Sequence, residues 1–252
     1  MFCRGIGTGH PDIANASRAI KQKEIDDCAS NNVTPIEYLI GYDGITISNS
    51  NNAPQASFTK EEVFKAVAAM VLIDGEWVKN PYMKWSDINP ALPNLDIDIM
   101  VPPTTSGTRD AFVELVMHKT CKAYGLPKKG ADGYKQMCTA MRTDGPVVPM
   151  GENDNLLIEK LGKDENRFGV FGYSFLDQNG DKVQGALIDG VEPTFDTIAD
   201  GSYAVSRPLY FYVKKEHIGV VPGIEEYTKL FMSESMIGDS GDLSEQGLIP
   251  VK

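Results

Sequence analysis

The chain has 252 residues, a formal net charge of −11 at pH 7, and 42% hydrophobic against 23% charged residues. This balance is typical of a folded protein, and the length is enough for one large domain or for two lobes. No stretch approaches the roughly 18 consecutive apolar residues of a membrane-spanning helix. The negative charge disfavours nucleic acid and anionic lipid as partners, but a few local donors can still hold a small anion.

The cysteines fall into two pairs that are close in sequence, Cys3 with Cys28 and Cys121 with Cys138. The even count and the short spacings favour two disulfides in an oxidising compartment, with four buried thiols as the alternative. The chain has no CxxC pair, and its three histidines are scattered. We therefore expect no metal site and no cofactor.

The first elements predicted in chain order are a strand, a helix and a second strand. Residues 12–18 indicate a strand end and a polar turn, and residues 19–25 a short helix with Ser17 at its start. Residues 36–47 are rich in β-branched and aromatic side chains, so they predict a strand that ends in the Asn/Ser cluster 48–52.

A capping box made by Thr59 and Glu62 predicts the next helix, whose apolar stripe extends to Val71. Residues 96–101 alternate as a strand does, and the segment 102–108 of Pro, Thr, Ser and Gly breaks that strand. A long amphipathic helix is predicted to follow and to end at Gly125. Its buried face is marked by Phe112, Val113, Leu115, Val116 and Tyr124.

The pair Asn179 and Gly180 is a strong hairpin turn signal between two β-prone runs, residues 167–175 and 183–188. We therefore predict a β-hairpin there.

The last predicted elements are a strand over residues 203–213, broken by Pro208, and an amphipathic helix over 224–232. Helices and strands alternate without a repeat, which indicates an α/β fold. Polar breaks at 48–52 and 201–206 are candidate crossings between two lobes. The predicted domains are a discontinuous lobe I, residues 1–49 and 205–252, and lobe II, residues 50–204.

The strongest candidate for a binding site is the run Ser106, Gly107, Thr108 and Arg109 at the start of the long helix. A helix start presents unpaired N–H groups and a positive dipole end, which suit a phosphate. Glycine permits close approach of the backbone, and the hydroxyls and the guanidinium add donors. The alternative is that Ser106 or Thr108 is an ordinary helix cap.

Ser17 and Arg18 offer a second hydroxyl and guanidinium at a second predicted helix start, with an exposed surface arginine as the alternative. Asp43 is a carboxylate in an otherwise apolar strand and needs a partner. Asp43 either accepts the proton of HPO₄²⁻, which would select phosphate over sulfate, or caps nearby turn amides.

Five segments, taken in order, resemble the periplasmic phosphate-binding proteins of bacterial phosphate importers, and the likeness covers essentially the whole chain. They are Asn-Ala-Ser-Arg-Ala-Ile-Lys at 15–21, Ile-Gly-Tyr-Asp-Gly-Ile at 40–45, Ser-Gly-Thr-Arg-Asp-Ala-Phe at 106–112, Gly-Ser-Tyr-Ala-Val-Ser-Arg-Pro-Leu at 201–209 and Gly-Leu-Ile-Pro at 247–250.

The resemblance implies a type II periplasmic-binding fold, with two α/β lobes joined by two crossing strands and phosphate held in the cleft. It implies a periplasmic or extracellular protein that hands phosphate to the membrane permease of an ABC importer and catalyses no reaction. The family's ligand contacts carry over to Ser17, Arg18, Ser106, Gly107, Thr108 and Arg109, and its acceptor carboxylate, whose position differs among members, to Asp43.

The chain departs from the family at its beginning. Family members start with a strand and a Ser/Thr-rich turn that supplies another phosphate-binding helix start, and nothing before Phe2 provides them. No secretory leader precedes Phe2 either, so we expect a cytosolic protein or a removed leader, with a truncated first lobe.

The sequence leaves two alternatives to phosphate capture. One is a phosphate-ester hydrolase, which is disfavoured because no histidine accompanies a Ser or Cys motif. The other is a surface scaffold with a vestigial cleft.

Overall fold

The computed structural model describes residues 1–125, 132–151 and 154–251. The chain forms two compact units. Unit 1 comprises Met1–Asp43, Ile198–Gly201 and Ser206–Lys252, and unit 2 comprises Gly44–Thr197 and Ser202–Val205. The domain boundaries at 49/50 and 204/205 stay a prediction, and parts of those domains, residues 126–131, 152–153 and 252, lie outside the described residues.

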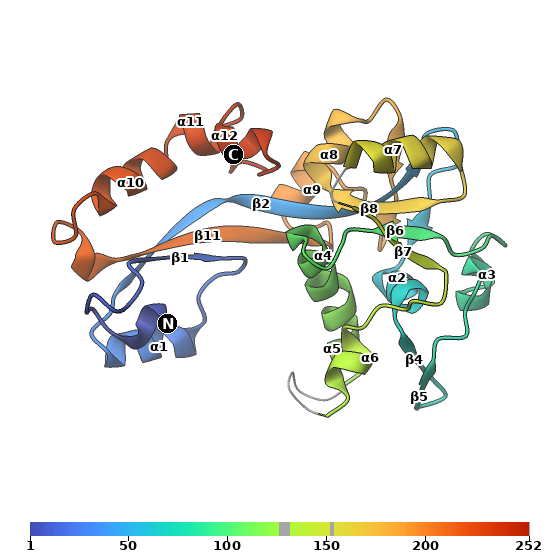
Figure 1. Ribbon diagram of the computed structural model, residues 1–252, viewed down its shortest axis with the longest axis horizontal. Helices are drawn as coiled ribbons and strands as arrows, with labels where there is room; N and C mark the ends of the chain where they lie inside the picture. Colours follow the sequence, from blue (N-terminus) through green and yellow to red (C-terminus); the bar gives the residue numbers. More distant parts are fainter. Residues whose placement is uncertain (126–131, 152–153, 252) are drawn as a thin grey trace. The chain divides into compact units, whose positions relative to one another are not determined.

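Unit 1 is built on a small sheet in which β11 lies between β1 and the first part of β2. β1 runs antiparallel to β11, with Ile13 opposite Val213 and Ala16 opposite Tyr210. The helices α1 and α10 lie on opposite faces of this sheet (Figure 1). The elements are η1 (Phe2–Arg4), β1 (Ile13–Ala16), α1 (Gln22–Ser30), β2 (Pro35–Ser50, shared with unit 2), β11 (Ser206–Lys214), η3 (Lys215–His217), α10 (Ile224–Phe231), α11 (Glu234–Ile237) and α12 (Asp242–Glu245).

The core of unit 1 on the α10 side contains four buried residues, Ile40, Phe211, Val213 and Ile224. Phe211 stacks on Phe231 of α10 at 4.7 Å between ring centroids. The helix predicted over 224–232 is therefore confirmed, and its apolar face is what attaches it to the sheet.

Unit 2 has a larger sheet in which β8 lies between the second part of β2 and β6, with β7 next to β6. β6 is parallel to both β7 and β8, whereas β8 is antiparallel to β2. The elements are β3 (Ser57–Phe58), α2 (Lys60–Val67), β4 (Met70–Ile73), β5 (Glu76–Lys79), α3 (Trp85–Ile88), β6 (Ile99–Val101), α4 (Gly107–Phe112), η2 (Val113–His118), α5 (Lys119–Ala123), α6 (Tyr134–Cys138), β7 (Val147–Pro149), α7 (Asp154–Lys163), β8 (Phe168–Gly172), α8 (Tyr173–Gln178), β9 (Val183–Gly185), β10 (Leu187–Ile188) and α9 (Phe195–Ala199, which ends in unit 1).

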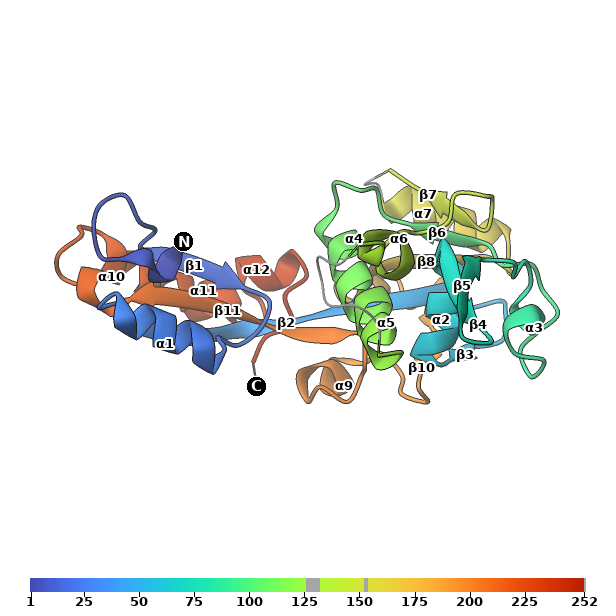
Figure 2. The same ribbon diagram turned by 90° about the horizontal axis from the view of Figure 1, so that it is seen from below.

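Helices cover both faces of the unit 2 sheet, as Figures 1 and 2 show. On one face, Leu157 and Leu161 of α7 pack in a cluster with Met100 and Phe171. On the other face, Phe58 stacks on Trp85 at 4.1 Å, and Phe168 of β8 meets both rings edge-on. The mixed α/β fold predicted from the alternation of helices and strands is confirmed.

Both predicted disulfides are present, Cys3–Cys28 in unit 1 and Cys121–Cys138 in unit 2. The first attaches η1 to α1, and the second attaches α5 to α6. Within the described residues, no helix is both long and apolar enough to span a bilayer.

The predicted hairpin at Asn179 and Gly180 is wrong. Residues Tyr173–Gln178 form the helix α8, and β8 and β9 each pair with β2. Asn179 is the C-cap residue of α8, and its side-chain amide donates to the Phe175 carbonyl over 3.0 Å. The Asn-Gly pair therefore ends a helix, since asparagine and glycine suit a helix end as well as a hairpin turn.

Two smaller predictions need correction. The capping box of Thr59 and Glu62 is confirmed, but α2 ends at Val67 and Val71 belongs to the strand β4. Pro208 does not break β11, which runs from Ser206 to Lys214. Proline has no N–H, and β1 pairs with β11 only from Tyr210 onwards, so Pro208 removes no hydrogen bond from the β1–β11 ladder.

Candidate functional site

The Ser-Gly-Thr-Arg segment lies where the chain leaves β6 and enters α4. Pro102 and Pro103 follow β6, and proline has no N–H with which to extend a strand ladder. Ser106 is the N-cap residue of α4, with extended backbone angles, but its side chain makes no capping hydrogen bond. The ordinary-cap interpretation of Ser106 is therefore not supported, and its hydroxyl is not committed to the helix.

The first turn of α4 presents backbone donors beside open space. The Ser106 N–H donates to the Pro103 carbonyl over 3.0 Å, but the N–H groups that follow in a first turn have no acceptor within their own helix. A Cβ atom added to Gly107 would meet no described heavy atom within 4 Å. An anion can therefore approach these amides closely, at the positive end of the helix dipole.

Arg109 adds a partly buried cation to the same turn. Its Nη1 donates to the Pro102 carbonyl over 2.9 Å, which ties the side chain back onto the end of β6. Burial lowers the pKa of Arg109 below its ordinary value, and the neighbouring Asp110 opposes that shift. Arginine remains charged at neutral pH, and a partly desolvated cation is stabilised by an anionic partner.

The helix that begins here is anchored by its apolar face. α4 continues without a break into the π-helical stretch η2 and then into α5, so one helical run extends from Gly107 to Ala123. This confirms the predicted long helix, and Gly125 follows it with a positive φ of 75°. Its buried residues are Ala111, Phe112, Leu115, Val116, Met117, Thr120 and Cys121.

Ser17 and Arg18 lie in a bend immediately after β1, not at a helix start. The prediction for Ser17 is wrong in this respect, because α1 begins at Gln22 with Lys21 as its N-cap. Glu24 fixes this start by accepting a hydrogen bond from the Lys21 N–H over 2.9 Å.

Glu24 also pairs with Arg18 through both of its oxygens, at 2.8 Å from Nη1 and 2.7 Å from Nη2. These bonds, followed by the one from the Lys21 N–H, lower the pKa of Glu24 from 4.5 to about 2. The Arg18 guanidinium is therefore held in a fixed orientation by a neutralising carboxylate.

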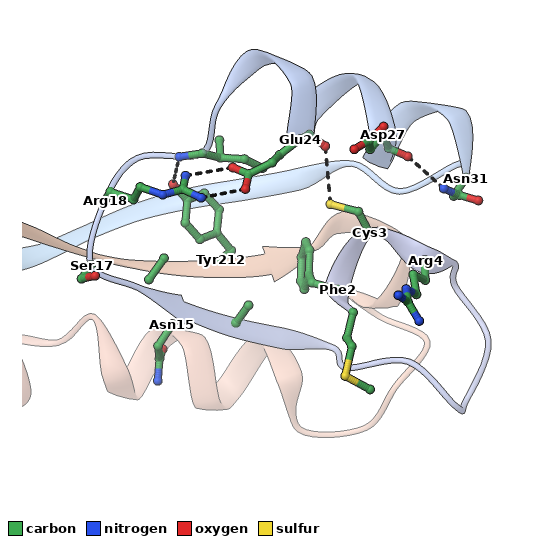
Figure 3. A pocket seen from close by; sticks show the side chains of 14 residues that line it. Phe2, Cys3, Arg4, Asn15, Ser17, Arg18, Glu24, Asp27, Asn31 and Tyr212 are labelled. Atoms are coloured by element: carbon green, nitrogen blue, oxygen red, sulfur yellow. Dashed lines mark hydrogen bonds and ion pairs between the residues drawn. The ribbon is translucent and has the colours of Figure 1, made fainter. Parts of the chain in front are cut away.

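Ser17 and Arg18 line a cavity of about 690 Å³ within unit 1 (Figure 3). Figure 3 shows the cavity between the sheet and α1, with Tyr212 of β11 pointing into it. The Tyr212 hydroxyl accepts the Ile20 N–H over 2.7 Å and donates to Glu37 over 2.5 Å. Burial and the Glu37 carboxylate raise the pKa of this phenol.

Asp43 forms an ion pair with Arg207, whose Nε donates to the Asp43 Oδ2 over 3.1 Å. The two side chains are only 25% and 18% exposed. The alternative in which Asp43 caps turn amides is replaced by this ion pair between β2 and β11.

The candidate residues fall on both units. Ser106 to Arg109 form one cluster in unit 2, and Ser17, Arg18 and Asp43 belong to unit 1. Sequence reasoning did not identify Glu24 or Arg207, which hold Arg18 and Asp43. Glu24 carried a signal, since glutamate three residues after a helix cap is typical of a capping box. Arg207 lies in one of the five segments that carry the resemblance, but nothing local connects it with Asp43.

The structure is that of a mixed α/β protein with a helix start, Ser106 to Arg109, that could hold an anion. The family model described as PBP superfamily domain matches residues 1–235. The chain belongs to the PBP superfamily.

Curated relatives include the phosphate-binding protein PstS of Staphylococcus saprophyticus, which is 30% identical over 234 residues, covering 90% of this chain and 62% of the relative. The protein SphX of Synechococcus elongatus is 26% identical, covering 99% of this chain and 65% of SphX. The chain therefore spans less than two thirds of the length of these relatives. The curated relatives named PstS are phosphate-binding proteins rather than enzymes.

Among solved structures, a possible phosphate-binding protein from Planctomyces limnophilus matches with a TM-score of 0.76 and 26% identity, covering 100% of this chain and 78% of the other. PstS from Borrelia burgdorferi matches with a TM-score of 0.66, at 18% identity and with 96% and 79% coverage, which shows a shared fold. A putative phosphate ABC transporter substrate-binding protein from Clostridium perfringens was solved with bound phosphate. It matches with a TM-score of 0.54 and 23% identity, covering 96% of this chain and 79% of that one.

Proposed function

We propose that this chain is part of an extracytoplasmic solute-binding protein that captures inorganic phosphate and delivers it to the membrane permease of an ABC importer. Two lobes, 1–49 with 205–252 and 50–204, are joined by two crossing strands and close on the anion. The protein binds phosphate without transforming it.

The observation that carries this proposal is the start of α4. Ser106 makes no cap bond, no described atom lies within 4 Å of a Cβ placed on Gly107, and Arg109 is a partly buried cation, so hydrogen-bond donors and a positive charge lie within one helical turn. A tetrahedral anion uses all of them at once, whereas an ordinary cap would consume the serine hydroxyl. Thr108 contributes the second hydroxyl.

The relatives support phosphate as the anion, because their names describe phosphate binding and one similar structure holds phosphate. Ser17 and Arg18 are proposed as the contribution of lobe I, with Arg18 presented by Glu24. The two disulfides support an oxidising compartment outside the cytoplasm.

Calorimetric titration of the chain with phosphate, arsenate and sulfate tests the proposal. We expect saturable heat with one phosphate per chain, a similar response to arsenate and a much weaker one to sulfate. No heat with any of the three anions would contradict phosphate capture and would favour a scaffold without a working site.

A further inference from the structure

Residues 5–12 form a strap in unit 1 between the disulfide-bonded η1 and the first strand. At one end of the strap Cys3 is bonded to Cys28 of α1. At the other end Ile13 of β1 pairs with Val213 of β11. The middle of the strap can therefore detach while both of its ends stay attached.

Two buried basic side chains hold successive carbonyls of the strap. The Lys214 Nζ donates to the Gly5 carbonyl over 2.6 Å, and the His217 Nε2 lies 2.7 Å from the Ile6 carbonyl oxygen. Lys214 is 0% exposed and His217 is 5% exposed. The strap carbonyls therefore take the place of water around these two side chains.

The surroundings of His217 call for a proton on each of its ring nitrogens. Its Nδ1 lies 2.5 Å from the Oδ1 of Asp12, while its Nε2 faces the Ile6 carbonyl. A carbonyl oxygen and an ionised carboxylate only accept hydrogen bonds, and a neutral imidazole has a single N–H to donate. Both contacts are hydrogen bonds only when the His217–Asp12 pair holds one proton more than a neutral imidazole beside a carboxylate, and this extra proton belongs to the pair.

The charged groups around His217 come from the strap, from β11 and from η3. Lys214 at the end of β11 and Lys215 in η3 disfavour an extra proton, whereas Asp12 and Glu216 favour it. Burial lowers the pKa of Lys214, and Asp12 and Glu216 oppose that shift. His10 is the other histidine of the strap. Of these groups Asp12 is in direct contact with the His217 ring, so it contributes most to holding the proton.

We propose that the strap is a proton-dependent clasp, which is docked on β11 and η3 while the His217–Asp12 pair holds its extra proton and is released as the pair loses it. Without that proton one of the two hydrogen bonds is lost, and a lone pair of the ring faces an acceptor oxygen. The docked form binds the proton more tightly than the released form, so the clasp is strongest at low pH and weakens as the pH rises. This inference is independent of phosphate capture.

The clasp also bears on the cavity of unit 1. The Phe2 ring lies 5.2 Å from the Lys214 Nζ and lines the same cavity as Ser17 and Arg18. Release of the strap separates Gly5 from Lys214 and so loosens the wall that Phe2 forms.

Amide hydrogen exchange of the full chain from about pH 5 to about pH 8, the range in which histidine changes its charge, tests the clasp. Each rate is expressed relative to the intrinsic rate at the same pH. The reporters are the N–H of residue 10, which donates to the Gly7 carbonyl, and the Lys214 N–H, which donates to the Asp12 carbonyl, each over 3.0 Å.

Protection of both amides is expected to fall about tenfold across this range, the scale of one charge-assisted hydrogen bond. In His217→Gln the protection should be low at every pH. His10→Gln is the matched control, because it removes the other histidine of the strap, and it should behave as the parent chain does.

Nitrogen NMR of the His217 ring in the parent chain is a second readout that does not depend on how a variant folds. Loss of the second ring proton should coincide with loss of protection, and Asp12→Asn should move both changes to lower pH, because an amide attracts the proton less. Protection that stays constant while the ring becomes neutral would overturn the inference. An equal pH dependence in His217→Gln and the parent would also overturn it, because another group, such as Lys214, would then be the one that titrates.

Discussion

The Arg109 side chain donates a hydrogen bond to the Pro102 carbonyl and also carries a partly desolvated charge at the start of α4. Replacement of Arg109 by alanine is expected to weaken phosphate binding by about 1–3 kcal/mol, the scale of a charge-assisted contact. Calorimetry measures this loss. Lys119→Ala, further along the same helical run in α5, is the control and should leave the affinity unchanged.

Glu24 is the residue with the most strongly lowered carboxyl pKa that bears on the site, about 2 against an ordinary 4.5. A lowered pKa means that the stabilising contribution is complete above pH 4.5 and is lost as the pH falls toward 2. Because the pair with Arg18 is largely exposed, we expect Glu24→Gln to cost only about 1 kcal/mol of unfolding free energy at pH 7.

Urea unfolding at several pH values measures this cost. The difference between Glu24→Gln and the parent should shrink steadily between pH 4.5 and pH 3. A difference that stays constant with pH would show that the carboxylate charge contributes nothing there.

Neighbours in the sequence can be grouped into a candidate site more easily than residues that only the fold brings together. Ser106 to Arg109 could be proposed from the sequence because the four residues are adjacent, and the structure places them at one helix start. The pairing of Asp43 with Arg207 could not, since 164 positions separate them and only the sheet brings them together.

At the scale of elements, Gly41 allows the C-terminal segment to come close enough to β2 to form main-chain hydrogen bonds. Tyr42 and Ile249 exchange two main-chain hydrogen bonds, of 2.8 and 2.9 Å. Gly41 has a φ of +154°, and a Cβ there would lie 2.5 Å from the Ile249 carbonyl oxygen. Glycine is therefore required both for the backbone angle and for the close approach.

We expect Gly41→Ala to destabilise the protein by about 1–3 kcal/mol and to speed amide exchange at Tyr42 and Ile249. Urea unfolding and hydrogen exchange measure the two effects. Gly162→Ala in α7 is the matched control, because a Cβ there meets no described atom within 4 Å and alanine favours a helix, so its stability should be unchanged or higher. Equal behaviour of the two variants would contradict the role given to Gly41.

Strong periodic or capping signals predicted the elements correctly, and isolated turn signals did not. The long helix from Gly107, the strand β2 and the capping box of Thr59 all agree with the structure. The helix α8 was missed because its aromatic residues, Tyr173 and Phe175, are equally typical of strands. Its helical form follows from packing, in which Leu176 joins the cluster beneath α7.

At the scale of the whole molecule, phosphate should stabilise the chain, because a ligand that binds only the folded state shifts the unfolding equilibrium by mass action. A phosphate concentration of about 100 times Kd adds about 2.7 kcal/mol. Thermal unfolding with and without phosphate measures this as a rise in Tm. The same concentration should give a smaller rise for Arg109→Ala, and an identical rise in both would indicate binding at another position.

The central claim is that the start of α4 holds the anion, and anomalous scattering from arsenic tests it most directly. A crystal of the chain grown with arsenate, which has the shape and charge of phosphate, should show one arsenic peak within hydrogen-bonding distance of the amides at Gly107, Thr108 and Arg109. An ordered arsenic peak elsewhere, with this turn empty, would contradict the account.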